Sequence, residues 1–209
     1  MIKNNIRRES YLKFLNTWKN RDLIKVLSGV RRSGKSTLLA MFQQDLKEQG
    51  VQDENIIAIN FEYMEFEELT DYRKLHDYVL SKVDKNKKNY VFLDEIQHVQ
   101  NFEKVVDSLY IRDYIDLYIT GSNAFFLSGE LATLLTGRYI EQHVLPLSFQ
   151  EFKQWHTENN PTIQQLSNRD LYAMYTRSSF PYTLAMTNQQ ETYDYLQAVY
   201  ASVMFKDER

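Results

Sequence analysis

The chain has 209 residues, of which 43% are hydrophobic, and it carries a formal net charge of −3 and no cysteine. This size and composition allow one well-packed core with room for a small appended domain. The charge gives no global case for nucleic-acid binding, and the absence of thiols excludes disulfides, a cysteine nucleophile and cysteine-ligated metals. The first residues lack an apolar signal core and no apolar run approaches a membrane span, so we expect a cytoplasmic protein without a membrane partner.

Helical and strand patterns alternate along the first part of the chain. Apolar residues at helical spacing predict an amphipathic helix over residues 8–20. Short apolar segments predict strands at residues 22–29, 55–62, 89–96, 115–123 and 139–148. Helical patterns follow the first four strands, at residues 35–50, 71–83, 101–110 and 128–138. This alternation predicts an α/β fold, with a five-stranded, mostly parallel sheet covered by helices on both faces.

The strand signal stops near residue 149. Helical patterns then cover residues 149–158, 167–177 and 192–208. We therefore expect an α/β domain over residues 1–150 and a small helical region over residues 151–209. The fifth strand is more polar than the others, which favours an edge position, and the acidic stretch at residues 61–69 is expected to be a solvated loop.

A phosphate-binding loop stands between the first predicted strand and its helix. The pattern Gly29-x-x-x-x-Gly34-Lys35-Ser36 matches Walker A, in which backbone N–H groups turn around an anionic phosphate. Lys35 would reach the β- and γ-phosphates, and the Ser36 hydroxyl would ligate Mg²⁺. The predicted nucleotide-binding residues are Gly29, Val30, Arg31, Arg32, Ser33, Gly34, Lys35, Ser36 and Thr37. The sequence thus predicts ATP or ADP and Mg²⁺ as cofactors.

Two adjacent acids end the third predicted strand. Asp94 would hold Mg²⁺ opposite Ser36, and Glu95 would orient and deprotonate the attacking water. Acids also suit the start of the following helix, and a helix cap is the alternative explanation. Because the phosphate loop follows a strand of the same sheet, we favour the catalytic assignment.

Polar residues end the fourth predicted strand. Ligands in such sheets bind outside the carboxyl ends of the strands, so Thr120, Ser122 and Asn123 should face the phosphates. Asn123 or Thr120 would position the lytic water, although a turn built on Gly121 explains the same residues without a function.

Several arginines are candidates for phosphate contacts. Arg138 lies between a predicted helix and the fifth strand, where it would answer charge that develops during phosphoryl transfer or simply meet the helix dipole. Arg31, Arg32 and Arg177 would either contact phosphate or remain solvated. If Arg138 acts on a neighbouring subunit, the protein forms a homo-oligomer.

Four segments together resemble a known family. They are GVRRSGKST at residues 29–37, FLDEIQ at 92–97, TGSNAFFLSGELATLLTGRY at 120–139 and LPLSFQEF at 145–152. They resemble a family of AAA+-type P-loop ATPases of bacteria and archaea, and the resemblance covers about residues 8–152. It implies a three-layer AAA+ domain with a helical lid, Walker B acids at Asp94 and Glu95, a sensor at Asn123 and an arginine finger at Arg138. The segment at Arg8 resembles one that flanks adenine in relatives of replication initiators.

The chain departs from the family in two ways. Ser178 and Ser179 stand where the family has a glycine pair before Phe-Pro, which alters the expected contact between lid and nucleotide. Family members also continue into a C-terminal domain, so this chain resembles their N-terminal part, and nucleic acid remains a candidate partner only for the longer protein. The leading expectation is an ATP hydrolase that rearranges a partner or its own C-terminal domain. The alternatives are a nucleotide-gated switch and a P-loop phosphotransferase.

Overall fold

The computed structural model describes residues 6–122, 135–159, 166–186 and 188–206. Its described residues form two compact units. One unit contains Glu9–Gly29 and Lys35–His143, and we call it the α/β unit. The other contains the residues up to Arg8, the loop Val30–Gly34 and the chain from Val144 onward, and we call it the helical unit. The strand and helix patterns predict a single boundary near residue 150, whereas in the structure residues 30–34 of the phosphate loop also belong to the helical unit.

The α/β unit is built on a five-stranded sheet with the order β2-β3-β4-β1-β5, and every pairing is parallel. Its strands are β1 (Ile24–Ser28), β2 (Ile56–Asn60), β3 (Asn89–Asp94), β4 (Ile115–Thr120) and β5 (Tyr139–His143). The central strands β1, β3 and β4 are buried along their whole length, as short apolar runs of a parallel sheet require. β5 pairs only with β1 and is partly exposed, which confirms the expected edge strand.

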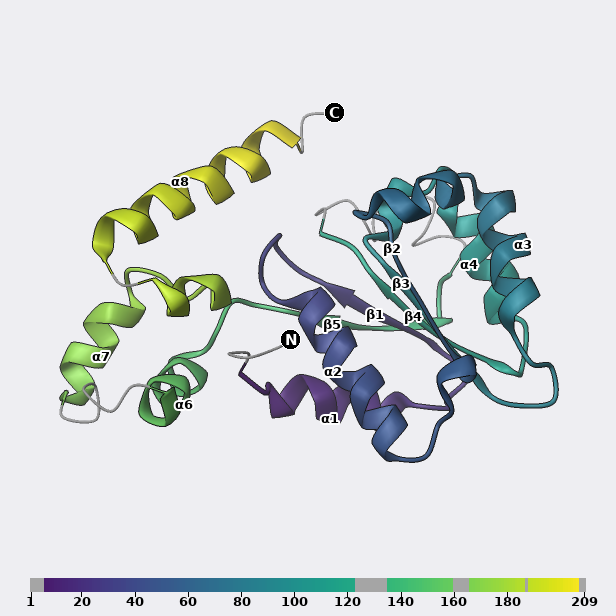
Figure 1. Cartoon of the computed structure of the whole chain (residues 1–209), viewed down its shortest axis with the longest axis horizontal. Coiled ribbons are helices and arrows are strands. Elements are labelled where there is room, and N and C mark those ends of the chain that lie inside the picture. Colours follow the sequence, from purple (N-terminus) through teal and green to yellow (C-terminus); the bar gives the residue numbers. More distant parts are fainter. Residues whose placement is uncertain (1–5, 123–134, 160–165, 187, 207–209) are drawn as a thin grey trace. The chain divides into compact units, whose positions relative to one another are not determined.

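Helices cover both faces of this sheet (Figure 1). They are α1 (Glu9–Trp18), α2 (Lys35–Glu48), α3 (Tyr72–Lys82) and α4 (Phe102–Tyr110). The face that carries Val26, Val91 and Ile119 packs against α3 and α4 in one apolar cluster. On the other face, the Phe42 ring of α2 lies 5.3 Å from the Tyr118 ring of β4. The α/β fold with a parallel sheet between two helical layers is therefore confirmed.

The short elements of the α/β unit are 3₁₀ helices. They are η1 (Asp53–Asn55), η2 (Met64–Thr70) and η3 (Ile96–His98). Most of the acidic stretch that we expected to be a solvated loop forms η2, in which no residue is buried, whereas Phe61 at its start is part of the core. The helix expected over residues 128–138 falls largely outside the described residues.

The helical unit contains α6 (Phe149–Asn159), α7 (Asn168–Tyr175), η5 (Pro181–Ala185) and α8 (Gln189–Lys206). Its apolar cluster consists of Ile6, Leu147, Phe152, Trp155 and Leu184. Ser167 caps α7 by accepting a hydrogen bond from the Asp170 N–H, and the Asp170 carboxylate accepts one in return. No described helix of either unit is long and apolar enough to cross a membrane.

Candidate functional site

The backbone of the phosphate loop has the conformations that a phosphate cradle needs. Gly29 and Gly34 have φ angles of 135° and 99°, which residues with a Cβ rarely adopt. Arg32 is also left-handed, with φ 69°, and the Ser33 N–H closes a turn on the Val30 carbonyl at 3.2 Å. Alternating right- and left-handed residues turn successive N–H groups toward one side, which creates an anion-binding concavity. Thr37 and Arg31 are half-buried and Arg32 is exposed.

Lys35 begins α2 and is 3% exposed. Its Nζ donates a hydrogen bond to the Gly29 carbonyl at 3.0 Å and lies 3.5 Å from Glu95 Oε1. Burial lowers the pKa of Lys35, and the negative charges of Glu95 and Asp94 oppose that shift. The ammonium is therefore buried between oxygen acceptors, and phosphate oxygens can replace them without exposing it to an apolar environment.

Asp94 ends β3 and accepts hydrogen bonds from its neighbours at the carboxyl end of the sheet. The donors are the Thr120 hydroxyl and, at 2.9 Å, Asn60 Nδ2. Burial raises the pKa of Asp94, and the hydroxyls of Ser36 and Thr120 oppose the shift. Since the exposed Ser36 lies near enough to lower the pKa of Asp94, both oxygens could reach a single cation.

These oxygens suit Mg²⁺ in particular. Mg²⁺ prefers hard oxygen ligands and keeps several waters, so it needs only one or two protein groups beside substrate phosphates. No group of three metal-ligating side chains is found within the described parts of the chain. One oxygen beside the phosphate loop and one at the end of β3, without a dedicated protein cage, match what a phosphate-bound Mg²⁺ requires.

Glu95 follows in a strained left-handed conformation, with φ 57° and ψ 48°. Such a conformation in a non-glycine residue is uncommon and clusters at functional sites. The Glu95 N–H donates to Thr120 Oγ1 at 2.9 Å, and its carboxylate accepts from Ser122 Oγ and Gln97 Nε2, each at 2.6 Å. The carboxylate is thus held in a fixed orientation beside Lys35.

The polar end of β4 supports the acids directly. Thr120 is fully buried, donates to Asp94 and accepts from the Glu95 N–H, so it positions the acid pair rather than a water. This corrects the alternative in which Thr120 orients the lytic water. Ser122 bonds to Glu95, and Asn123 lies outside the described residues.

Arg138 lies away from these acids. Its carbonyl accepts the Ile24 N–H at 2.8 Å, which places it at the amino end of β1, whereas the phosphate loop leaves the carboxyl end. Its guanidinium forms an ion pair with Asp107 of α4 and lies 5.8 Å from the centre of the Tyr110 ring. The length of β1 therefore separates Arg138 from the start of its own phosphate loop.

Arg8, expected to contact the nucleotide, is instead satisfied by protein atoms within the helical unit. It donates to both Glu151 carboxylate oxygens, at 2.8 and 3.2 Å, and to the carbonyls of Ser33, Leu145 and Pro146, at 3.1, 2.8 and 3.2 Å. These bonds occupy all five guanidinium hydrogens. Arg8 thus acts on the phosphate loop through the Ser33 carbonyl. We call this set of bonds the Arg8 clamp.

Sequence reasoning missed three of these supporting residues. Asn60 lies near the end of the strand predicted at residues 55–62 and ends β2, so the rule that ligands lie at carboxyl strand ends would have found it. Gln97 follows the acid pair closely, but only the turn at Glu95 brings its amide back to the carboxylate. Glu151 carries no local signal, because its partner Arg8 is 143 positions away.

Comparison with known proteins places this arrangement in a family. The family model described as an AAA domain matches residues 21–153. An uncharacterised protein of Haemophilus influenzae is 40% identical over 209 residues, which are 99% of this chain and 51% of that protein. The chain therefore spans about half the length of this relative.

Two solved structures share the fold. The Walker-type ATPase of Pyrococcus abyssi matches with a TM-score of 0.64 and 15% identity, over 99% of this chain and 76% of that one. DnaA of Aquifex aeolicus, solved with AMPPCP bound, matches with a TM-score of 0.55 and 12% identity, over 92% and 60% of the two chains. The family model spans most of the chain, and the chain has the fold of these solved structures. The chain therefore belongs to the AAA domain family of AAA+ P-loop ATPases.

Proposed function

We propose that the chain binds Mg²⁺-ATP at residues 29–37 and hydrolyses it to ADP and phosphate. The observation that carries the proposal is the buried Lys35 ammonium 3.5 Å from Glu95, next to Asp94, which Thr120 and Asn60 hold in place. A hydroxyl and a carboxylate suited to hold a metal, a cation suited to hold phosphate and a candidate base would thus meet at one site. The AMPPCP bound to the DnaA structure supports a nucleotide of this kind as the ligand.

Each residue has a separable part in this reaction. Lys35 would exchange the Gly29 carbonyl for phosphate oxygens, and the backbone N–H groups of the loop would hold the β-phosphate. Ser36 and Asp94 would hold Mg²⁺, which would offset the negative charge of the phosphates. Glu95 would accept the proton of the attacking water. Thr120 and Asn60 keep Asp94 oriented through hydrogen bonds.

One observation favours the nucleotide-gated switch as a second candidate. The Glu95 carboxylate already accepts hydrogen bonds from Ser122 and Gln97 and lies beside Lys35. A base held this way has fewer lone pairs for water, so turnover would be slow until these bonds rearrange. In that case the protein would respond to the bound nucleotide more than it consumes it.

We further propose that Arg138 acts on the site of a neighbouring subunit. Its position at the amino end of β1 argues against a role at its own phosphate loop. Release from Asp107 would free the guanidinium for a partner's γ-phosphate, where such an arginine contributes about 10³–10⁵ in rate. In this proposal residues 151–209 act as a lid, Asn123 as a sensor, and hydrolysis rearranges a partner or the rest of a longer protein.

Glu95→Gln tests hydrolysis against switching. The amide keeps the shape of the side chain but cannot take a proton, so ATP affinity should persist while kcat falls about 10²–10⁴-fold. Binding is measured by calorimetry and turnover by phosphate release, with Glu54→Gln at an exposed position as the control. Wild-type turnover in Glu95→Gln would reject Glu95 as the base and leave the switch as the better account.

A further inference from the structure

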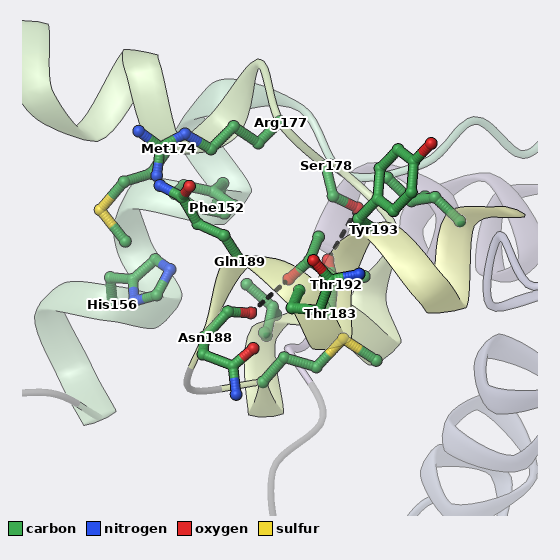
Figure 2. Close-up of a pocket in the computed structure, with 14 residues that line it drawn as sticks. Phe152, His156, Met174, Arg177, Ser178, Thr183, Asn188, Gln189, Thr192 and Tyr193 are labelled. Carbon is green, nitrogen blue, oxygen red and sulfur yellow. Dashed lines mark hydrogen bonds between the residues drawn. The ribbon is translucent and has the colours of Figure 1, made fainter.

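The helical unit contains a cavity that the proposed ATP chemistry does not use. The cavity has a volume of about 580 Å³, within the range of about 300–1,000 Å³ typical of small-molecule sites. Figure 2 shows its walls, which come from α6, the end of α7, η5 and the first turns of α8. All of these elements belong to the same unit.

One wall of the cavity is apolar. Phe152 and Leu184 line it and are 4% and 8% exposed, and the Met174 thioether lies beside them. Figure 2 shows Met174, Phe152 and His156 gathered on one side of the cavity. The Phe152 ring meets the His156 ring edge to face, with 4.4 Å between their centres. Flat or branched hydrocarbon groups would be well matched to this wall.

His156 places an unsatisfied polar atom in the same wall. The residue is 6% exposed, and its Nδ1 has no hydrogen-bond partner among the residues that the structure describes. Burial lowers the pKa of His156, so the ring is neutral near pH 7. A buried polar atom without a partner costs free energy, and native structures usually reserve such atoms for water or a ligand. A ligand group bonded to Nδ1 would remove that cost.

The cavity also has a positively charged lining residue. Arg177 lines the cavity, and no Asp or Glu stands among its described lining residues. With the Gln189 amide oriented to accept, its oxygen bonds the Arg177 guanidinium and holds it at the first turn of α8. Asn188 caps this helix by accepting the Glu191 N–H at 2.8 Å. The amino end of the 18-residue α8 therefore adds its positive dipole beside the Arg177 charge.

We propose that this cavity binds a small organic anion with an apolar body. Its carboxylate or phosphate head would lie at Arg177 and the amino end of α8. Its body would pack on Phe152, Met174 and Leu184, and a polar group would bond His156 Nδ1. The site would let such a metabolite act on the helical unit independently of ATP.

Anilinonaphthalene sulfonate tests this directly, because it joins an aromatic body to one anionic group. Phenylnaphthylamine has the same body without the charge, and we expect it to bind at least about tenfold more weakly. Arg177→Gln should weaken sulfonate binding about tenfold or more, and Arg177→Lys should retain part of it. Arg169→Gln, at an exposed position of α7, is the matched control and should not change binding.

Two further measurements decide whether the probe occupies this cavity. The ring ¹⁵N signals of His156 should shift when the sulfonate binds, and naphthoate or naphthyl phosphate should displace it, which identifies the preferred head group. The proposal is overturned if both probes bind equally, if folded Arg177→Gln binds as wild type, or if neither competitor displaces the sulfonate. Displacement by ATP would assign the cavity to the nucleotide site, and weaker binding at higher protein concentration would assign it to a second copy of the chain; either result also overturns the proposal.

Discussion

The Arg8 clamp gives the sharpest test of how the phosphate loop is held. Arg8→Lys keeps the positive charge but replaces a planar fork of five donors with three donors on one nitrogen. Lysine cannot reach both Glu151 oxygens and the carbonyls of Ser33, Leu145 and Pro146 together. Each hydrogen bond to a charged group contributes about 1.5–3 kcal/mol, so losing one or two should lower the unfolding free energy by about 1.5–6 kcal/mol.

The effect on ATP follows from the Ser33 bond. Without its anchor the loop must be ordered when the nucleotide binds, and ordering one residue costs about 1–2 kcal/mol. We therefore expect the Kd for ATP to rise about 5- to 30-fold in Arg8→Lys. A fluorescent ATP analogue measures the Kd, and urea denaturation measures the stability. Arg7→Lys, one residue earlier and exposed, serves as the control.

A double-mutant cycle with Glu151→Gln separates the two contributions. If the clamp holds the loop, the two substitutions should weaken ATP binding by less together than the sum of their separate effects, because both remove the same restraint. Loss of stability with an unchanged Kd would refute the reasoning. Arg8 would then only join the first residues of the helical unit to α6.

Four other predictions follow from the site. Lys35→Ala should strongly weaken ATP binding, because the phosphates lose the point charge of the loop, and calorimetry on a variant shown to be folded measures the loss. Ser122→Ala should lower kcat about tenfold with little change in ATP affinity, since Glu95 loses one orienting hydrogen bond; equal loss of affinity would show that Ser122 supports the loop instead. Mixing inactive Lys35→Ala with inactive Arg138→Ala should restore part of the phosphate release if Arg138 acts in a neighbouring subunit, and a mixture that stays inactive would return Arg138 to a structural role with Asp107. Burial alone would raise the pKa of Glu151, but hydrogen bonds from Arg8 and Ser148 outweigh burial and lower the pKa. The clamp therefore contributes its full stability above the ordinary carboxyl pKa of about 4.3, and this stability is lost as the pH falls through the lowered pKa. Glu151→Gln should flatten this acidic part of the dependence of stability on pH, which urea denaturation measures.

Local patterns in the sequence were enough to predict the strands and helices and to select candidate residues for the site. The buried strands read as short apolar runs, and a strand, a glycine-rich loop and a helix in succession identified the phosphate loop at Gly29–Ser36. Asp94 and Glu95 were found because parallel strands deliver their last residues to one edge of the sheet. Each of these signals spans fewer than about ten residues, the range over which strand, helix and turn preferences act.

Only the tertiary structure decided which distant groups meet. The order β2-β3-β4-β1-β5 puts Asn60 and Thr120 beside Asp94, and neither neighbour follows from the chain order of the strands. The family resemblance predicts a nucleotide contact for Arg8, whereas in the structure its five donors bond Glu151 and three carbonyls. Arg138 took its place at the amino end of β1 through a strand pairing. Hydrogen bonds and ion pairs depend on distances of a few ångströms between atoms, and for residues 25 to 143 positions apart only the folded chain sets those distances.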